Sequence, residues 1–154
     1  MKKFAITGIG TDVGKTVVSA ILVEALKAKY WKPVQAGDLS NSDSIKVRSL
    51  CPDAKILEEV YRLSEPMSPH AAARIDGIKI QIDDFTLPTI DGNFIVEGAG
   101  GLMVPLNDDG LTYADVFEQW QLPVVIVSKH YLGSINHSLL TAELLKARKL
   151  LPAS

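Results

Sequence analysis

A glycine-rich stretch near the N-terminus most constrains what this chain can fold into. The stretch runs from Thr7 to Thr16 with the sequence TGIGTDVGKT, and it lies between a short apolar run, Phe4–Ile6, and a broadly apolar segment, Val17–Leu26. A buried strand, a glycine-rich loop and a helix that begins at Gly-Lys-Thr form the architecture of a phosphate-binding P-loop. Glycines allow backbone conformations that other residues avoid, so successive N–H groups can converge on phosphate oxygens at the positive end of the helix dipole.

Lys15 and Thr16 complete the P-loop pattern, in which the lysine reaches the β- and γ-phosphates and the hydroxyl ligates Mg²⁺. Five residues separate Gly8 from Gly14, against four in the standard pattern. The glycine spacing also allows a dinucleotide-binding loop, which needs an acidic residue after the second strand to hold a ribose hydroxyl. The corresponding segment, 32–35, has no acidic residue. The stretch therefore predicts a nucleotide site of the P-loop type.

The composition is that of one soluble α/β domain. The chain has 154 residues, of which 47% are hydrophobic and 22% charged, and its net charge is −2. This length suits a single domain over residues 1–154, and the charge gives no sign of nucleic-acid binding. No apolar run approaches the roughly 20 residues of a membrane span, and no secretory segment precedes the first strand. Cys51 is the single cysteine, which excludes a disulfide framework, and we expect a cytoplasmic protein.

Alternating apolar segments predict a doubly wound, mostly parallel α/β sheet with helices on both faces. The predicted strands are 4–6, 31–35 (after a turn at 28–30), 94–96 and 123–127. The predicted helices are 17–26, 44–50, a short one from Ala71, one capped by Thr112 that ends at Trp120, and 134–150. The last helix has an apolar side formed by Leu139, Leu140, Leu144, Leu145 and Ala147. Residues 75–93 give no clear element.

Ligands in open parallel sheets bind at the carboxyl ends of the strands. Three predicted strand ends carry polar, glycine-bearing loops, at Gly8, at 35–37 and at Glu97. Glu97 ends an apolar strand, where a Mg²⁺ ligand is favoured over a carboxylate that merely caps the glycine loop. Asp43 is an N-cap by default, and Lys32 is by default a solvated lysine at a strand end. Lys32 lies next to the phosphate site, however, and is placed to balance developing charge.

Six motifs, in order along the chain, resemble those of the dethiobiotin synthetases. They are the P-loop at 8–16, Lys32–Val34, Asn41–Asp43, Glu65–His70, Val96–Gly101 and Leu132–His137. The P-loop alone would indicate only a P-loop ATPase. The resemblance implies a P-loop NTPase-like fold and ATP- and Mg²⁺-dependent ring closure in biotin biosynthesis. In that reaction CO₂ adds to one amine of 7,8-diaminononanoate, ATP phosphorylates the carbamate, and the second amine displaces phosphate.

The resemblance also implies roles for individual residues. The implied catalytic residues are Lys15, Lys32 and Thr11. The implied nucleotide-binding residues are Asp12, Val13, Gly14, Lys15, Thr16, Val17, Asp43, Glu97, Gly98, Ala99 and Gly100. Thr16, Asp43 and Glu97 would surround Mg²⁺. The implied substrate-binding residues are Ala36, Gly101, Ser134, Ile135 and Asn136. In the family the start of the last helix receives the substrate carboxylate from the partner subunit, which implies a homodimer; an ordinary serine N-cap at Ser134 is the alternative.

The chain departs from the family pattern at three places. Ala36 stands where a hydroxyl residue is common, the connection before Lys32 is short, and the sequence ends at Ser154, where family members continue into another strand and further elements. We therefore expect the fold to lack the last strand and helix, which leaves strand 123–127 without a neighbour on one side. Two alternatives to the enzyme stay open. One is a truncated, non-catalytic nucleotide-binding remnant, and the other is a partitioning-type P-loop ATPase, although its usual second lysine is absent from Ile6–Gly8.

Overall fold

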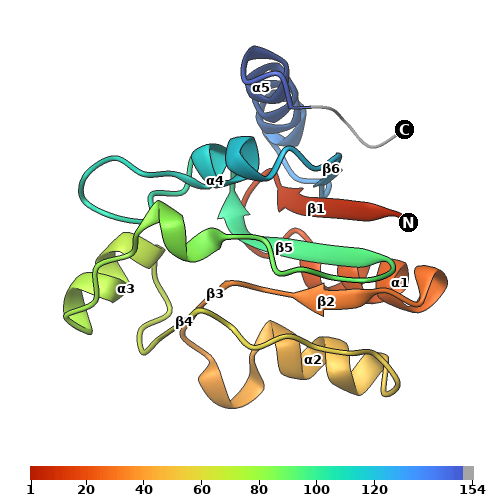
Figure 1. Cartoon of the computed structure of the whole chain (residues 1–154). Coiled ribbons are helices and arrows are strands. Elements are labelled where there is room, and N and C mark those ends of the chain that lie inside the picture. Colours follow the sequence, from red (N-terminus) through yellow and green to blue (C-terminus); the bar gives the residue numbers. More distant parts are fainter. Residues whose placement is uncertain (151–154) are drawn as a thin grey trace.

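The computed structural model describes residues 1–150 and contains the predicted parallel α/β sheet (Figure 1). The main sheet has four strands in the order β2-β5-β1-β6, and all of its pairs are parallel. These strands are β1 (Lys3–Gly8), β2 (Lys29–Trp31), β5 (Phe94–Gly101) and β6 (Val124–Val127). A smaller sheet pairs β3 (Val34–Ala36) with β4 (Tyr61–Leu63), of which β4 has no counterpart in the sequence prediction. Residues 151–154 of the predicted domain lie outside the described residues.

The helices follow the sequence prediction closely. They are α1 (Lys15–Leu26), α2 (Asp43–Leu50), α3 (Pro69–Ile75), α4 (Tyr113–Trp120) and α5 (Ser134–Ala147), with short 3₁₀ turns η1 (Leu39–Asn41) and η2 (Ile82–Phe85). At the start of α4, Thr112 and Asp115 form a reciprocal capping box, as the predicted cap requires. Helix α3 begins two residues earlier than predicted, because proline is well tolerated in the first helical turn.

The two faces of the main sheet are covered by different helices, and α1 and α4 lie on opposite sides of it (Figure 1). Side chains alternate along each strand. On β5, Ile95 therefore packs with the α1 side of the core, whereas Phe94 and Val96 pack with the aromatic side chains of α4. This alternation decides which polar strand residues face the P-loop helix.

The prediction of a turn at 28–30 followed by one strand at 31–35 is wrong. Lys29–Trp31 already forms β2, which pairs with β5, and the chain then passes into the smaller sheet at Val34. The break falls at Pro33, which has no N–H to donate. Its carbonyl accepts hydrogen bonds from the backbone of Val60 and Tyr61, and this connects the end of β2 to the segment that precedes β4.

The prediction that Glu97 ends its strand is wrong, because β5 continues through the glycine run to Gly101. Glu97 pairs with Ile6, the register then shifts, and Gly101 pairs with Gly8. The glycines allow close packing, since a Cβ on Gly98 would lie 3.3 Å from Cζ of Phe117. The run therefore forms an extended strand pressed against β1 and α4, where its composition alone suggested a loop.

The predicted apolar side of the last helix is only partly buried. Leu145 is buried, whereas Leu139 and Leu140 are 60% and 61% exposed, and the helix ends at Ala147 rather than at residue 150. Arg148 holds this end of the helix to α4, with Nη1 3.0 Å from Asp115 Oδ1 and 2.8 Å from Glu118 Oε2. Among the described residues, the apolar packing of α5 on the core therefore comes from its C-terminal half. Among residues 1–150, no helix is both long and apolar enough to span a membrane.

Candidate active site at the carboxyl edge of the main sheet

The carboxyl ends of the main strands meet at one edge of the sheet, because all of them run parallel. The backbone N–H of Ile9 donates to the carbonyl of Val127 at 3.0 Å, which ties the P-loop to the end of β6. Gly8 pairs with Gly101 at the end of β5. The third strand end that we expected here, at 35–37, belongs instead to the smaller sheet. The P-loop is therefore framed by β5 and β6.

The P-loop curls around the ammonium group of Lys15. Gly14 caps α1 with a φ of 101°, and Asp12 also adopts a left-handed conformation, with a φ of 55°. The buried Lys15 donates to the carbonyl of Gly10 at 2.9 Å. Burial, and then repulsion from Lys32, lower the pKa of Lys15. The charges of Glu97, Asp43 and Asp12 favour the Lys15 ammonium but do not offset these two effects, so a bound anion would stabilise it further.

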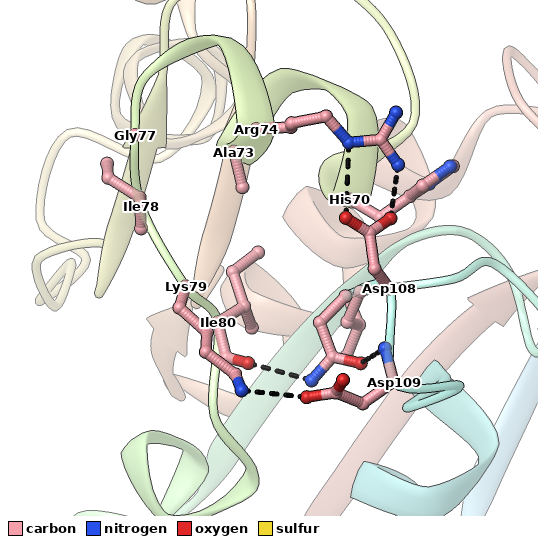
Figure 2. Close-up of a pocket in the computed structure, with 11 residues that line it drawn as sticks. His70, Ala73, Arg74, Gly77, Ile78, Lys79, Ile80, Asp108 and Asp109 are labelled. Carbon is pink, nitrogen blue, oxygen red and sulfur yellow. Dashed lines mark hydrogen bonds and ion pairs between the residues drawn. The ribbon is translucent and has the colours of Figure 1, made fainter.

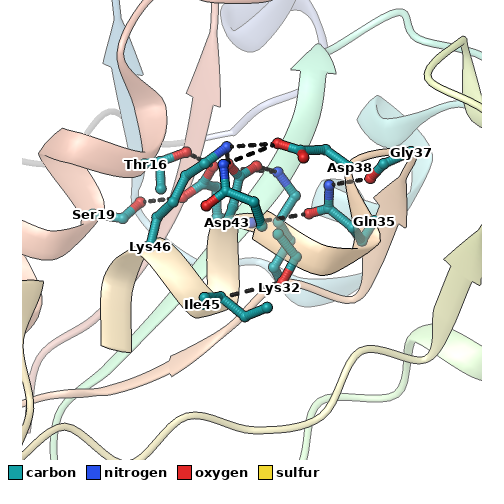
Figure 3. Close-up of polar contacts among 12 residues, drawn as sticks. Thr16, Ser19, Lys32, Gln35, Gly37, Asp38, Asp43, Ile45 and Lys46 are labelled. Carbon is teal, nitrogen blue, oxygen red and sulfur yellow. Dashed lines mark hydrogen bonds and ion pairs between the residues drawn. The ribbon is translucent and has the colours of Figure 1, made fainter. Parts of the chain in front are cut away.

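Glu97 is the centre of a buried polar cluster on the α1 face of the sheet. Figure 3 shows Thr16, Ser19, Lys32 and Asp43, whose side chains gather there. Its Oε2 accepts from the hydroxyl of Ser19 at 2.6 Å and from the hydroxyl of Tyr30 at 3.0 Å. Its Oε1 accepts from Thr16 at 3.2 Å and from Lys32 at 3.4 Å. Sequence reasoning missed Ser19 and Tyr30, because nothing local to either residue indicates that it faces a carboxylate more than 60 positions away.

Lys32 joins the two acidic residues of the cluster. Its ammonium bonds to Asp43 and to Glu97, and the residue is 5% exposed, so its default prediction as a solvated lysine is wrong. Burial alone would lower the pKa of Lys32, but the charges of Glu97 and Asp43 together outweigh burial and raise this pKa. Burial likewise opposes ionisation of Asp43, yet Lys32 reverses that effect and lowers the pKa of Asp43.

The default prediction that Asp43 is an N-cap is also wrong. Ser42 caps α2 through a hydrogen bond that its Oγ accepts from the N–H of Ile45, and Asp43 is the first residue of the helix. Gln35 fixes the preceding loop. Its Oε1 accepts from the N–H of Asp43 at 3.2 Å, and its Nε2 donates to the carbonyl of Gly37 at 2.8 Å. Asp43 therefore does not cap the helix, and the hydrogen bond from its backbone N–H to Gln35 helps to hold it beside Lys32.

The oxygen donors of this cluster fit a Mg²⁺ ion. Thr16, Asp43 and Glu97 supply one hydroxyl and two carboxylates around Lys32. Mg²⁺ is usually bound through one or two carboxylates together with substrate phosphates and water. Within residues 1–150 no group of three or more histidine, cysteine or acidic side chains forms a cage made by protein alone. The donor set thus suits an ion that arrives with a nucleotide.

The end of β5 lies against the P-loop. A Cβ on Gly101 would lie 3.3 Å from the carbonyl oxygen of Gly8, and one on Gly100 would lie 3.7 Å from Oγ1 of Thr11. Of the predicted nucleotide-binding residues of this strand, Gly100 thus borders the loop, whereas Gly98 lies against Phe117 and Ile6. Thr11 and Asp12 are exposed on its outer side, as are Gly14 and Val17, while Val13 is buried beneath it.

The predicted substrate residues from other segments lie outside the cluster. Ala36 is half-buried at the end of β3. Ser134, Ile135 and Asn136 open α5, and among the described residues no hydrogen bond or ion pair links their side chains to the Glu97 cluster. Gly133, with a φ of 103°, is the N-cap of α5, so the alternative of an ordinary serine cap at Ser134 is wrong. Ile135 and Asn136 are exposed.

A pocket of about 370 Å³ lies elsewhere, between α3 and the loop at 106–109 (Figure 2). Its charged side chains are already paired. Arg74 forms a two-pronged ion pair with Asp108, and Lys79 lies 2.8 Å from Asp109. Because the pocket shares no residue with the P-loop or the Glu97 cluster, the buried cluster remains the candidate active site.

Comparison with known proteins agrees with the geometry of this site. A family model described as "AAA domain" matches residues 2–153. A protein of Christiangramia forsetii named ATP-dependent dethiobiotin synthetase BioD is 58% identical over 149 residues, which is 96% of this chain and 71% of that protein. Proteins with the same name from Rhodopseudomonas palustris and Cytophaga hutchinsonii are each 52% identical, over 95% and 97% of this chain and 70% and 73% of theirs.

The chain belongs to the ATP-dependent dethiobiotin synthetase family. This membership confirms the resemblance carried by the six motifs and favours the synthetase over a partitioning ATPase. Family membership also agrees with the P-loop NTPase-like fold. In residues 1–150, β6 is an edge strand of the main sheet. The candidate active site thus lies where a member of a nucleotide-dependent family carries its P-loop.

Proposed function

We propose that this chain is an ATP-dependent cyclo-ligase that converts 7,8-diaminononanoate and CO₂ to dethiobiotin, with release of ADP and phosphate. The observation that carries the proposal is the buried cluster in which Thr16 of the P-loop helix, Lys32, Asp43 and Glu97 converge from four segments of the chain. The names of the relatives support it. The proposed pathway is biotin biosynthesis, and the proposed location is the cytoplasm.

Each cationic residue has one role in this proposal. Lys15 and the N–H groups of the P-loop hold the nucleotide phosphates, with Thr11 and Asp12 on the outer side of the loop. Lys32 stays protonated across the physiological range, because its carboxylate partners raise its pKa, and it balances charge on the carbamate and on the phosphoryl group in transfer. Thr16, Asp43 and Glu97 would hold Mg²⁺, which supplies neutralisation of phosphate charge when bound.

The proposed reaction has three bond-forming steps. One amine nitrogen of the diamine bonds to the carbon of CO₂ and loses a proton, which gives a carbamate. A carbamate oxygen then takes the γ-phosphoryl group, and ADP leaves. The second amine attacks the carbonyl carbon of this carbamic-phosphoric anhydride, loses a proton and expels phosphate, which closes the cyclic urea. Phosphoryl transfer depends mainly on positioning and charge neutralisation, which are what a rigid, buried set of charged groups provides.

A homodimer is part of the proposal. The N-terminal half of α5 and the loop before it expose a row of apolar side chains, namely Leu132, Ile135, Leu139 and Leu140. A contiguous exposed apolar surface indicates an interaction site. The start of α5, whose N–H groups have no side-chain cap, would receive the carboxylate of a diamine bound to the partner subunit. The double substitution Leu139→Asp and Leu140→Asp is expected to yield a folded monomer in sedimentation, while a dimer of unchanged affinity would contradict this interface.

Phosphate release is the decisive test of the enzymatic proposal. The purified protein is incubated with ATP, Mg²⁺ and bicarbonate, with and without 7,8-diaminononanoate, and dethiobiotin is measured in parallel. Release that requires the diamine, with dethiobiotin formed in equal amount, is the expected result. Release without the diamine would indicate a bare ATPase. No phosphate release by a folded, nucleotide-binding protein would indicate a non-catalytic remnant.

A further inference from the structure

The carboxylate of Glu97 is held asymmetrically. An ionised carboxylate has about four acceptor positions, two on each oxygen. Both hydrogen bonds to Oε2 come from neutral hydroxyls that are fully buried, those of Ser19 and Tyr30. Oε1 also has two donors, but both contacts are longer, 3.2 Å from Thr16 of the P-loop helix and 3.4 Å from Lys32, which also pairs with Asp43, so a bound cation can displace them. Oε2 is thus bonded to buried core hydroxyls, whereas Oε1 faces the groups expected around the nucleotide.

The backbone around Tyr30 fixes the phenol in place. Tyr30 pairs with Ile95 of β5 on one side. On its other side, its N–H donates to the carbonyl of Lys55 at 3.0 Å, and its carbonyl accepts from the N–H of Leu57 at 2.8 Å. Because Tyr30, Ile95 and Glu97 lie on the same face of the sheet, the phenol reaches Glu97 across the register of two strands. Burial, together with the charge of Glu97, raises the pKa of Tyr30, so the phenol keeps the proton that it donates.

We infer that Tyr30 and Ser19 are positioning residues that reserve Oε2 of Glu97 and leave only Oε1 to approach the cation. The inference rests on the proposed function, because it assigns a metal to this site. Ca²⁺ often takes both oxygens of a carboxylate, whereas Mg²⁺ demands a compact octahedral shell. A carboxylate with one available oxygen therefore favours Mg²⁺ over Ca²⁺. Tyr30 and Ser19 thus act on metal choice through Glu97, without touching the nucleotide.

A purely structural role for the two hydroxyls makes a different prediction. Any buried carboxylate needs hydrogen-bond donors, so loss of either hydroxyl should lower stability whether its role is purely structural or positioning. Only the positioning role changes the relative affinity for two divalent cations. The decisive quantity is therefore the ratio of Mg²⁺ to Ca²⁺ affinity, measured separately from turnover.

The experiment measures metal binding to the protein–ADP complex. Mn²⁺ binding is followed by electron paramagnetic resonance, and Mg²⁺ and Ca²⁺ are ranked by competition. The variants are Tyr30→Phe and Ser19→Ala, and the second keeps the test open if the first fails to fold. Tyr61→Phe is the matched control, because its phenol also bonds to a carboxylate, that of Asp84, away from the site. Ser49→Ala is the control for serine, since Ser49 is exposed on α2 and its hydroxyl donates to the carbonyl of Lys46 in the same helix.

We expect each site variant to bind Mg²⁺ about 10-fold more weakly, within the range known for partners of metal ligands, with a smaller change for Ca²⁺. Affinity for ADP without metal should be unchanged, and both controls should match the wild type. A wild-type ratio of Mg²⁺ to Ca²⁺ affinity in both Tyr30→Phe and Ser19→Ala would overturn the inference, whatever their stability. If the wild type itself bound no metal with ADP, the proposed function would fail as well.

Discussion

Substitution of Lys32 by glutamine tests the charge balance of the buried cluster most directly. The Lys32 side chain is 6% exposed, and it forms ion pairs with Asp43 and with the fully buried Glu97. Glutamine keeps much of the length and some hydrogen-bonding capacity but removes the charge. Two carboxylates would then share a site without the cation between them, so we expect a loss of both stability and turnover.

The size of the stability loss follows from burial. Removal of one partner from a buried ion pair costs about 3–5 kcal/mol, because the other charge remains buried and uncompensated. The lower end applies here, since the Asp43 side chain is 20% exposed and Lys46 lies 3.6 Å from it. For a domain of this size, a loss of about 3 kcal/mol corresponds to a fall in melting temperature of roughly 6–12 °C.

The same loss should depend on pH. Lys32 lowers the pKa of Asp43 below its usual value of 3.8 in the folded protein. The pair therefore stabilises the fold fully above that usual value, and its contribution is lost as the pH falls through the lowered pKa. The difference in unfolding free energy between wild type and Lys32→Gln should thus be complete at neutral pH and should shrink below about pH 4.

Urea unfolding gives the measurement, provided that both proteins unfold with the same slope. Lys46→Gln is the matched control, because Lys46 contacts the same Asp43 from a position that is 40% exposed, where an ion pair contributes about 0–1 kcal/mol. Millimolar Mg²⁺ should stabilise Lys32→Gln more than the wild type, since the ion replaces the missing positive charge. A loss at neutral pH no larger than that of Lys46→Gln would refute the reasoning.

Two further substitutions examine the P-loop. Lys15→Gln should abolish diamine-dependent phosphate release but should not lower stability. Burial disfavours the Lys15 ammonium and lowers its pKa below 10.5, so the charged lysine destabilises the fold at all lower pH values. Full activity of this variant would contradict the assignment of the loop as the phosphate site. Gly8→Ala should weaken ADP binding at least 10-fold, since the new Cβ would lie 2.7 Å from Cγ2 of Val13 and 2.8 Å from the carbonyl of Gly10. Gly10→Ala meets no atom within 4 Å and should bind ADP like the wild type in calorimetry, so equal losses in both variants would contradict the steric argument.

Much of the fold could be predicted from sequence, because its signals are local. Apolar runs marked three of the main strands, the Gly-Lys-Thr sequence marked the start of α1, and Thr112 with Asp115 marked the start of α4. The P-loop was predicted from its glycine pattern, and Glu97 and Lys32 from their positions near strand ends, whereas the role of Asp43 came from motif resemblance. The structure brings Thr16 of the P-loop, Lys32, Asp43 and Glu97 together. Each of these features depends on residues only a few positions apart, or on a motif that can be recognised in the chain itself.

The tertiary structure decided the features that depend on register and packing. Tyr30 faces Glu97 only because β2 and β5 align in one register and side chains alternate on each strand. The glycines after Glu97 form a strand because β1 and α4 approach closely enough to exclude side chains there. The exposed half of α5 could not be distinguished from its buried half by spacing, since burial depends on what lies opposite each turn. Local sequence thus determined which residues could do chemistry here, whereas contacts between distant segments determined which of their atoms face one another.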